Sequence, residues 1–196
     1  MTSPGTRSVH FRAACSDDAA AVADLHADSW RRHYRGAYAD AFLDGDIVSE
    51  RRAVWASRLA AIGPTATILA EDAGGLIGFV HVIFDEDHLW GSLIDNLHVR
   101  SAQRRGGLGT ALLAQVADAI ERRASAPAAY LWVLEQNTDA QGFYRARGGA
   151  FVERAPVPPP GGDASRLTGA PYGIRVAWPR GLTHPSTAGA APDSSR

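Results

Sequence analysis

Residues 101–116, SAQRRGGLGTALLAQV, constrain the fold of this chain more than any other stretch. The residues before them, LIDNLHV, alternate as in a β-strand, and those after, TALLAQVADAIERR, have the apolar spacing of an amphipathic helix. The junction between the two holds three glycines and two arginines. A helix N-terminus attracts anions, glycine lets a ligand approach the backbone, and arginine binds phosphate oxygens through two hydrogen bonds. The junction therefore predicts a pyrophosphate cradle, with a plain glycine-rich connector as the alternative.

Two other kinds of phosphate loop do not fit this junction. A P-loop requires a lysine, and all 20 basic residues of the chain are arginine. A dinucleotide-binding loop requires a third glycine and a preceding βαβ start, and GLGTAL offers neither. The cradle must therefore act through backbone amides and arginine.

Composition restricts the class of protein further. The chain has 196 residues, a net charge of −1 and 45% hydrophobic residues, which describes one soluble globular domain and neither a nucleic-acid-binding nor a membrane protein. No apolar run approaches the roughly 20 residues that span a bilayer, and the N-terminus has no apolar core of a secretion signal. The single cysteine, Cys15, cannot form an internal disulfide. We expect a cytoplasmic protein.

Hydrophobic periodicity predicts one α/β domain with a mixed sheet. The order of elements reads β-α-α-β-β-β-α-β-α-β. The small polar segments 1–7 and 181–196 are expected to be tails around a domain at 8–180. Strands are predicted at 9–14, 66–72, 76–84, 92–99, 129–134 and 172–178, and helices around 17–30, 48–62, 110–123 and 138–147.

Two motifs together carry a resemblance to a known family. LIDNLHVRSAQRRGGLGTALL resembles the acetyl-CoA motif of the GNAT superfamily of N-acetyltransferases, with R-x-x-G-x-G at Arg104–Gly109. LWVLEQNTDAQGFYRARGG resembles the second motif of that family, although Gly149 stands where a bulky residue is usual. LHADSWRRHYRGAYADAFLDG resembles the first-helix region of many bacterial members. The resemblance spans about residues 9–178.

The resemblance implies a mostly antiparallel sheet that splays at the cofactor site, and it assigns roles to individual residues. Backbone groups of Leu97, His98 and Val99 would hold the pantetheine arm and polarise the acetyl carbonyl, and Asn137 would contact the arm. Tyr144 would protonate the departing thiolate, a role that suits a phenol with a pKa near 10. The pyrophosphate of CoA would be bound by Arg104, Arg105, Gly106, Gly107, Leu108, Gly109 and Thr110.

The general base is open between two carboxylates. Asp95 lies in an otherwise apolar strand, where a carboxylate is costly unless it is paired or used. Strict alternation places Asp95 with Leu97 and Val99, although a β-bulge could re-aim it. Glu135, at the end of the next strand, is the second candidate, with a water-mediated route open to it. A structural ion pair is the alternative for both carboxylates. His98 is a third, less favoured option, since alternation points it away.

The expected activity is transfer of an acetyl group from acetyl-CoA to a primary amine of a small molecule or peptide. Trp30 and Tyr34 are candidates for the acceptor pocket, although bulky residues at helical spacing more often belong to a core. No metal-ligand spacing is present, and a homodimer is compatible with the sequence. The alternatives are a non-catalytic acetyl-CoA-binding sensor or partner subunit, and a binder of another nucleotide.

Overall fold

The computed structural model describes residues 8–182 as one domain with a seven-stranded sheet. The expected tail 1–7, and residues 183–196 of the expected tail 181–196, lie outside the described residues. The strands are β1 (His10–Ala13), β2 (Thr65–Asp72), β3 (Gly75–Asp87), β4 (Gly91–Val99), β5 (Ala129–Leu134), β6 (Ala150–Pro156) and β7 (Tyr172–Trp178). The α-helices are α1 (Ala19–His33), α2 (Asp40–Leu43), α3 (Ile47–Ala60), α4 (Leu108–Arg123) and α5 (Thr138–Arg145).

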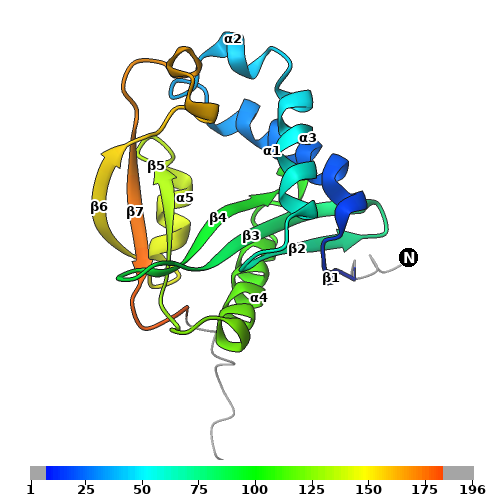
Figure 1. Ribbon diagram of the computed structural model, residues 1–196, viewed down its shortest axis with the longest axis vertical. Coiled ribbons are helices and arrows are strands. Elements are labelled where there is room, and N and C mark those ends of the chain that lie inside the picture. Colours follow the sequence, from blue (N-terminus) through cyan, green and yellow to red (C-terminus); the bar gives the residue numbers. More distant parts are fainter. Residues whose placement is uncertain (1–7, 183–196) are drawn as a thin grey trace, which may run out of the picture.

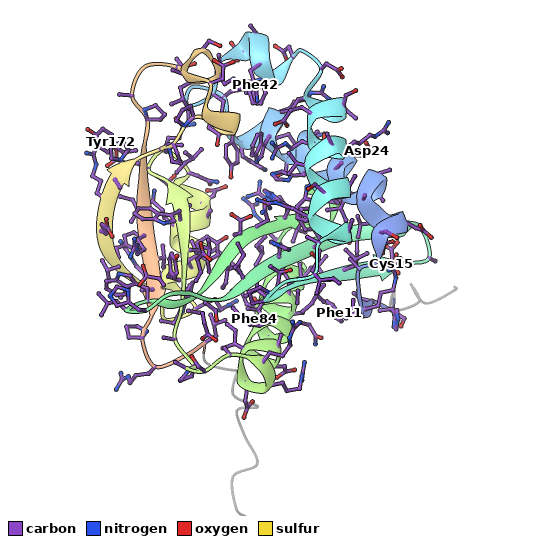
Figure 2. All side chains as sticks on the ribbon, viewed as in Figure 1. Phe11, Cys15, Asp24, Phe42, Phe84 and Tyr172 are labelled. Carbon is purple, nitrogen blue, oxygen red and sulfur yellow. The ribbon has the colours of Figure 1, made fainter. Side chains whose placement is uncertain are left out.

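The sheet has the order β1-β2-β3-β4-β5-β7-β6, and only the β4–β5 pair is parallel. Helices α1 and α3 cover one face of β2–β4, and α4 covers the other (Figure 1). Figure 2 shows side chains filling the spaces between the sheet and the helices, with Phe84 of β3 beside α4. Burial of these apolar faces, as with Leu112 of α4 and Trp55 of α3, is the main force that holds the layers together.

The sheet splays between its two halves. The parallel pairing of β4 with β5 extends only over Ser92–Ala129 and Leu93–Tyr130. Beyond Leu93 the two strands diverge (Figure 1), while β4 stays paired with β3 as far as Val99. The later part of β4 therefore has no strand partner on its β5 side. The expected mixed, splayed sheet is confirmed.

One strand was not predicted. β6 lies at the sheet edge and pairs with β7, whereas the sequence pattern assigned AFVERAP to an irregular connection. Most of its residues are exposed, so it lacks the alternation of buried and exposed residues that identifies a half-buried strand. The pairing with β7 alone makes it a strand.

The unusual Gly149 is explained by a tryptophan from β7. A Cβ at Gly149 would lie 2.5 Å from Val176 Cγ1 and 2.9 Å from Trp178 Cζ2. The indole Nε1–H of Trp178 donates to the carbonyl oxygen of Arg147 at 2.8 Å, which fixes the ring in this place. Trp178 thus occupies the space into which a bulky residue at 149 would project.

Candidate active site

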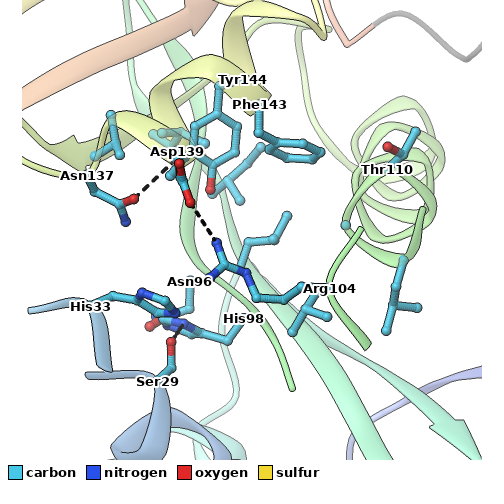
Figure 3. A pocket seen from close by; sticks show the side chains of 18 of the residues that line it. Ser29, His33, Asn96, His98, Arg104, Thr110, Asn137, Asp139, Phe143 and Tyr144 are labelled. Atoms are coloured by element: carbon cyan, nitrogen blue, oxygen red, sulfur yellow. Dashed lines mark hydrogen bonds and ion pairs between the residues drawn. The ribbon is translucent and has the colours of Figure 1, made fainter. Parts of the chain in front are cut away.

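A cavity of about 540 Å³ opens where β4 and β5 diverge. Its walls come from α1, β4, the loop before α4, β5 and α5 (Figure 3). Nearly all the residues that the sequence predicts to bind the cofactor or to act in catalysis line this one cavity. From that set they are Asp95, Leu97, His98, Val99, Arg104, Arg105, Gly107, Leu108, Gly109, Thr110, Asn137 and Tyr144; Tyr34, a predicted acceptor residue, lines it as well.

The loop before α4 has the backbone that an anion cradle needs. Gly107 is the residue before the first turn of α4 and has φ of +82°, a left-handed conformation that glycine adopts without strain. No atom lies within 4 Å of the place where a Cβ of Gly107 would be, so the backbone there is open to a ligand. Arg105 is also left-handed, with φ of +66°. Arg105 therefore adopts a turn conformation that glycine would take without strain, and it does so at a cost in backbone strain.

Backbone groups of β4 form another wall. Leu97, His98 and Val99 pair with β3 on one side, and β5 has moved away on the other. N–H and C=O groups on an unpaired strand edge are available to a ligand in extended conformation. This edge can therefore take up an amide-containing chain such as a pantetheine arm.

A β-bulge turns the side chain of Asp95 to the other face of β4. His81 of β3 pairs with Asn96, and Val82 pairs with Ile94, so Asp95 is the extra residue on β4. Its Oδ2 accepts hydrogen bonds from Arg58 Nη1 of α3 at 2.6 Å and from Asn96 Nδ2 at 2.5 Å. Asp95 therefore faces the α1 and α3 side of the sheet, whereas Leu97 and Val99 pack on the α4 side. The alternation that grouped the three is broken by the bulge.

Glu135 lies outside the cavity. It borders a separate depression of about 390 Å³, and its two carboxylate oxygens accept from Arg154 Nε and Nη2 at 2.7 and 2.8 Å. These hydrogen bonds lower the pKa of Glu135. The placement favours the structural ion pair over a role as base.

Tyr144 of α5 and Asn137, the residue just before that helix, both reach the cavity (Figure 3). Tyr144 is buried, and burial raises the pKa of its phenol well above its usual value. Asn137 caps α5: its Oδ1 accepts from the N–H of Ala140 at 3.2 Å. Because Oδ1 is used in the cap, the amide NH₂ is the end of Asn137 that a ligand in the cavity can meet.

The two predicted acceptor residues have different positions. Tyr34 lines the cavity, and burial together with the charge of Asp95 raises the pKa of its phenol to about 12. Trp30 does not line it: the indole is buried, with Arg51 above one face and the ring of Tyr34 stacked at 5.3 Å. Trp30 supports Tyr34 from the core, and the expectation that it lines the pocket is corrected.

His98 belongs to the cavity through its side chain as well as its backbone. Its Nδ1 is hydrogen-bonded to Ser29 Oγ of α1 at 2.8 Å (Figure 3). Burial lowers the pKa of the imidazole to about 4, so the ring is neutral at pH 7. The bulge at Asp95 also brings His98 to the same side of β4 as that carboxylate.

Sequence reasoning missed several residues of the cavity. Ser29 and His33 come from α1, and Asp139, Phe143 and Arg147 from α5 and the residues after it. Gly106, which was predicted to bind, is not among the lining residues. The one available signal was the second arginine in FYRAR, four residues after Phe143 and so on the same helical face.

Within residues 8–182, no three His, Cys, Asp or Glu side chains are grouped so that they could hold a metal ion. No helix of that part of the chain is both long enough and apolar enough to cross a membrane.

Comparison with known families identifies the fold. The model of the acetyltransferase (GNAT) family matches residues 19–149, from the first residue of α1 to the glycine after α5. This chain belongs to the GNAT family. The match includes the loop before α4, the splayed strands and α5, and so every lining residue of the cavity lies inside it. No curated protein sequence matches the chain.

Solved GNAT structures share the fold at low sequence identity. The PaiA N-acetyltransferase of Thermoplasma acidophilum, in complex with coenzyme A, is 17% identical; the match covers 87% of this chain and 99% of that chain, with a TM-score of 0.64. A GCN5-related N-acetyltransferase of Rhodopseudomonas palustris is 20% identical over 87% and 96% of the two chains, with a TM-score of 0.65. NAA60 of Arabidopsis thaliana, with a bisubstrate analogue, is 17% identical over 87% and 97%, with a TM-score of 0.60.

Proposed function

We propose that this protein is an acetyl-CoA-dependent N-acetyltransferase, which moves the acetyl group to a primary amine of a small molecule or peptide by direct attack in a ternary complex. The observation that carries the proposal is the single cavity that joins the Gly107 loop, the open edge of β4 and the phenol of Tyr144. An anion cradle, a strand edge and a proton donor are the three features that a CoA thioester requires of an acetyltransferase.

Binding follows from the walls of the cavity. The loop amides around Gly107 and the guanidinium groups of Arg104 and Arg105 attract the pyrophosphate. The free edge of β4 at Leu97–Val99 binds the amides of the pantetheine arm, and the NH₂ group of Asn137 approaches the arm from α5. The acceptor amine reaches the thioester from the side of Tyr34.

The transfer itself needs a base, a site for the oxyanion and an acid. The ammonium form of the acceptor loses a proton to Asp95, directly or through water, and the free amine attacks the acetyl carbon. Backbone N–H groups of β4 stabilise the negative charge that develops on the carbonyl oxygen. The C–N bond forms, the C–S bond breaks, and Tyr144 gives its proton to the departing thiolate. The extra proton on the attacking nitrogen then passes, through water, to the Tyr144 phenolate, which leaves a neutral amide and a neutral phenol.

Burial raises the pKa of Tyr144, so the phenol is protonated at neutral pH, which is the form that a proton donor needs. A cytoplasmic location is part of the proposal. Cys15 is a free, exposed thiol, which is compatible with a reducing compartment.

Two measurements test the proposal. Acetyl-CoA at hundreds of micromolar should raise the melting temperature, and NAD or ATP should do so far less, because a ligand that binds only the folded state stabilises it by mass action. Incubation with a panel of amines should then release free CoA thiol in step with acetylated product. Binding with no transfer to any amine would favour the sensor, and equal shifts with all three nucleotides would indicate a generic anion site.

A further inference from the structure

Arg147 lies beside the first turn of α4. It follows α5 by two residues, lines the cavity, and donates from Nε to Thr110 Oγ1 at 3.0 Å. Its guanidinium carbon lies 5.6 Å from the centre of the Phe143 ring. That ring in turn lies against Gly109, where a Cβ would come within 3.2 Å of Phe143 Cζ. The end of α5 and the first turn of α4 thus hold Arg147 between them.

The charge of Arg147 has no anionic partner among the described residues. Its hydrogen bonds there are to the hydroxyl of Thr110 and, from Nη1, to the carbonyl oxygen of Ala146 at 3.3 Å. Arg104, on the same cavity, differs in this respect because its Nη2 lies 3.7 Å from Asp139 Oδ2 (Figure 3). An arginine held against a ligand cavity with Nη2 free is suited to bind an anion from that ligand.

The ligand proposed for this cavity carries two separate anionic groups. The pyrophosphate fits the backbone amides of the loop and of the start of α4. The 3′-phosphate is attached to the ribose, at the end of CoA that lies farthest from the thioester. Arg147 comes from a different element than the loop, and its Nε is already fixed on Thr110. We propose that Arg147 binds the 3′-phosphate of CoA and so makes the protein select CoA over 3′-dephospho-CoA. This inference rests on the proposed function and adds a specificity-determining residue to it.

The chain supplies a matched control for the charge of Arg147. Arg145 lies two residues earlier, its guanidinium stacks on Phe151 with 4.5 Å to the ring centre, and it does not line the cavity. Replacement of either arginine by glutamine removes one positive charge from the same short segment. Only the change at position 147 removes a group from the cavity.

The test is a comparison of CoA with 3′-dephospho-CoA by isothermal titration calorimetry on the full chain. The wild-type protein and Arg145→Gln should bind CoA about tenfold or more tightly than dephospho-CoA, the scale of one charge-assisted contact to phosphate. Arg147→Gln should bind CoA more weakly and dephospho-CoA as tightly as the wild type does. The variant should therefore lose most of the preference for CoA. Arg147→Lys, which keeps the charge, should restore part of the ratio.

Three outcomes would overturn the inference. Equal wild-type affinity for the two ligands would show that the 3′-phosphate is not recognised. An equal loss of both affinities in Arg147→Gln would assign Arg147 to the pyrophosphate that both ligands carry, or to a structural role through Thr110. If Arg105→Gln lost the preference for CoA over dephospho-CoA and Arg147→Gln kept it, the 3′-phosphate would be bound by Arg105 in the loop and not by Arg147. In all three cases CoA still binds the wild type, so the proposed function survives; absence of CoA binding would overturn both.

Discussion

Arg58 of α3 donates a 2.6 Å hydrogen bond to Asp95, the bulged residue of β4. Asn96 donates to the same carboxylate oxygen, so the side chain is held in one orientation at the cavity wall. About a quarter of the Asp95 side chain is still exposed (27%), which leaves room for water or an amine at the carboxylate. The geometry makes Asp95 the base candidate with access to the cavity.

Asp95→Asn and Glu135→Gln form a matched pair of variants. If Asp95 takes the proton of the acceptor, Asp95→Asn should lower kcat by roughly tenfold to a thousandfold at unchanged acetyl-CoA affinity. Glu135→Gln should stay within about twofold of wild type, because Glu135 faces Arg154 outside the cavity. Steady-state kinetics with an accepted amine gives both values; the reverse ranking would make Glu135 the base.

Tyr144→Phe separates acid catalysis from packing. The change removes the proton donor and little volume, so acetyl-CoA affinity should hold while kcat and kcat/KM fall together by roughly tenfold to a thousandfold. Calorimetric titration measures the affinity, and thiol release measures the rates. Weaker binding at unchanged kcat would instead make the phenol a contact to the cofactor.

Gly107→Val tests the anion cradle. Valine is strained at a φ of +82°, by about 1–2 kcal/mol, and its side chain would stand in the path of the pyrophosphate. We expect no detectable acetyl-CoA binding and a fold kept intact, since no atom of the protein lies within 4 Å of the new Cβ. Circular dichroism checks the fold. A variant that binds acetyl-CoA like the wild type would refute the cradle.

Three buried histidines predict a loss of stability in mild acid. Burial lowers the pKa of His81 and of His98 to about 4 and that of His26 well below its usual value. The unfolded chain takes up protons below about pH 6.5 and the folded chain does not, so the stability present above pH 6.5 falls as the pH drops toward 4. His81 and His98 each contribute on the order of 1–2 kcal/mol to this loss at pH 5, and His26 adds to it in the same direction.

His81→Asn checks this dependence away from the cavity. His81 Nδ1 is hydrogen-bonded to Thr67 Oγ1 at 2.8 Å, and an asparagine amide can take that partner without titrating. Urea unfolding at pH 5 and pH 8 should therefore show a smaller difference in unfolding free energy for the variant than for the wild type. An identical difference would exclude His81 as a contributor.

Gly149→Ala tests the packing of Trp178. The new methyl group would meet Val176 and Trp178 at 2.5 and 2.9 Å, and overpacking of this kind typically costs about 1–3 kcal/mol. Gly142→Ala, inside α5 with no atom within 4 Å of the new Cβ, should stabilise the protein by about 0.5–1 kcal/mol. Urea unfolding of both variants at pH 8 measures the contrast.

Local patterns in the sequence were sufficient for most of the elements and for the anion loop. The junction of strand, Gly107 and helix is specified within a dozen residues, because glycine at a left-handed position and apolar spacing in α4 act through nearest neighbours. Edge strand β6 was missed for the same reason: its residues carry no buried face, and only β7 pairs with it.

Only the tertiary structure decided which polar side chains line the cavity. Asp95 and Glu135 look alike in the sequence, as carboxylates in or after an apolar strand. A bulge and the distant Arg58 hold one in the cavity, and Arg154 holds the other outside it. Arg147 reaches the first turn of α4, where its Nε donates to Thr110, because Phe143 of α5 lies against Gly109. These positions depend on contacts between residues far apart in the chain, which local propensity and periodicity do not encode.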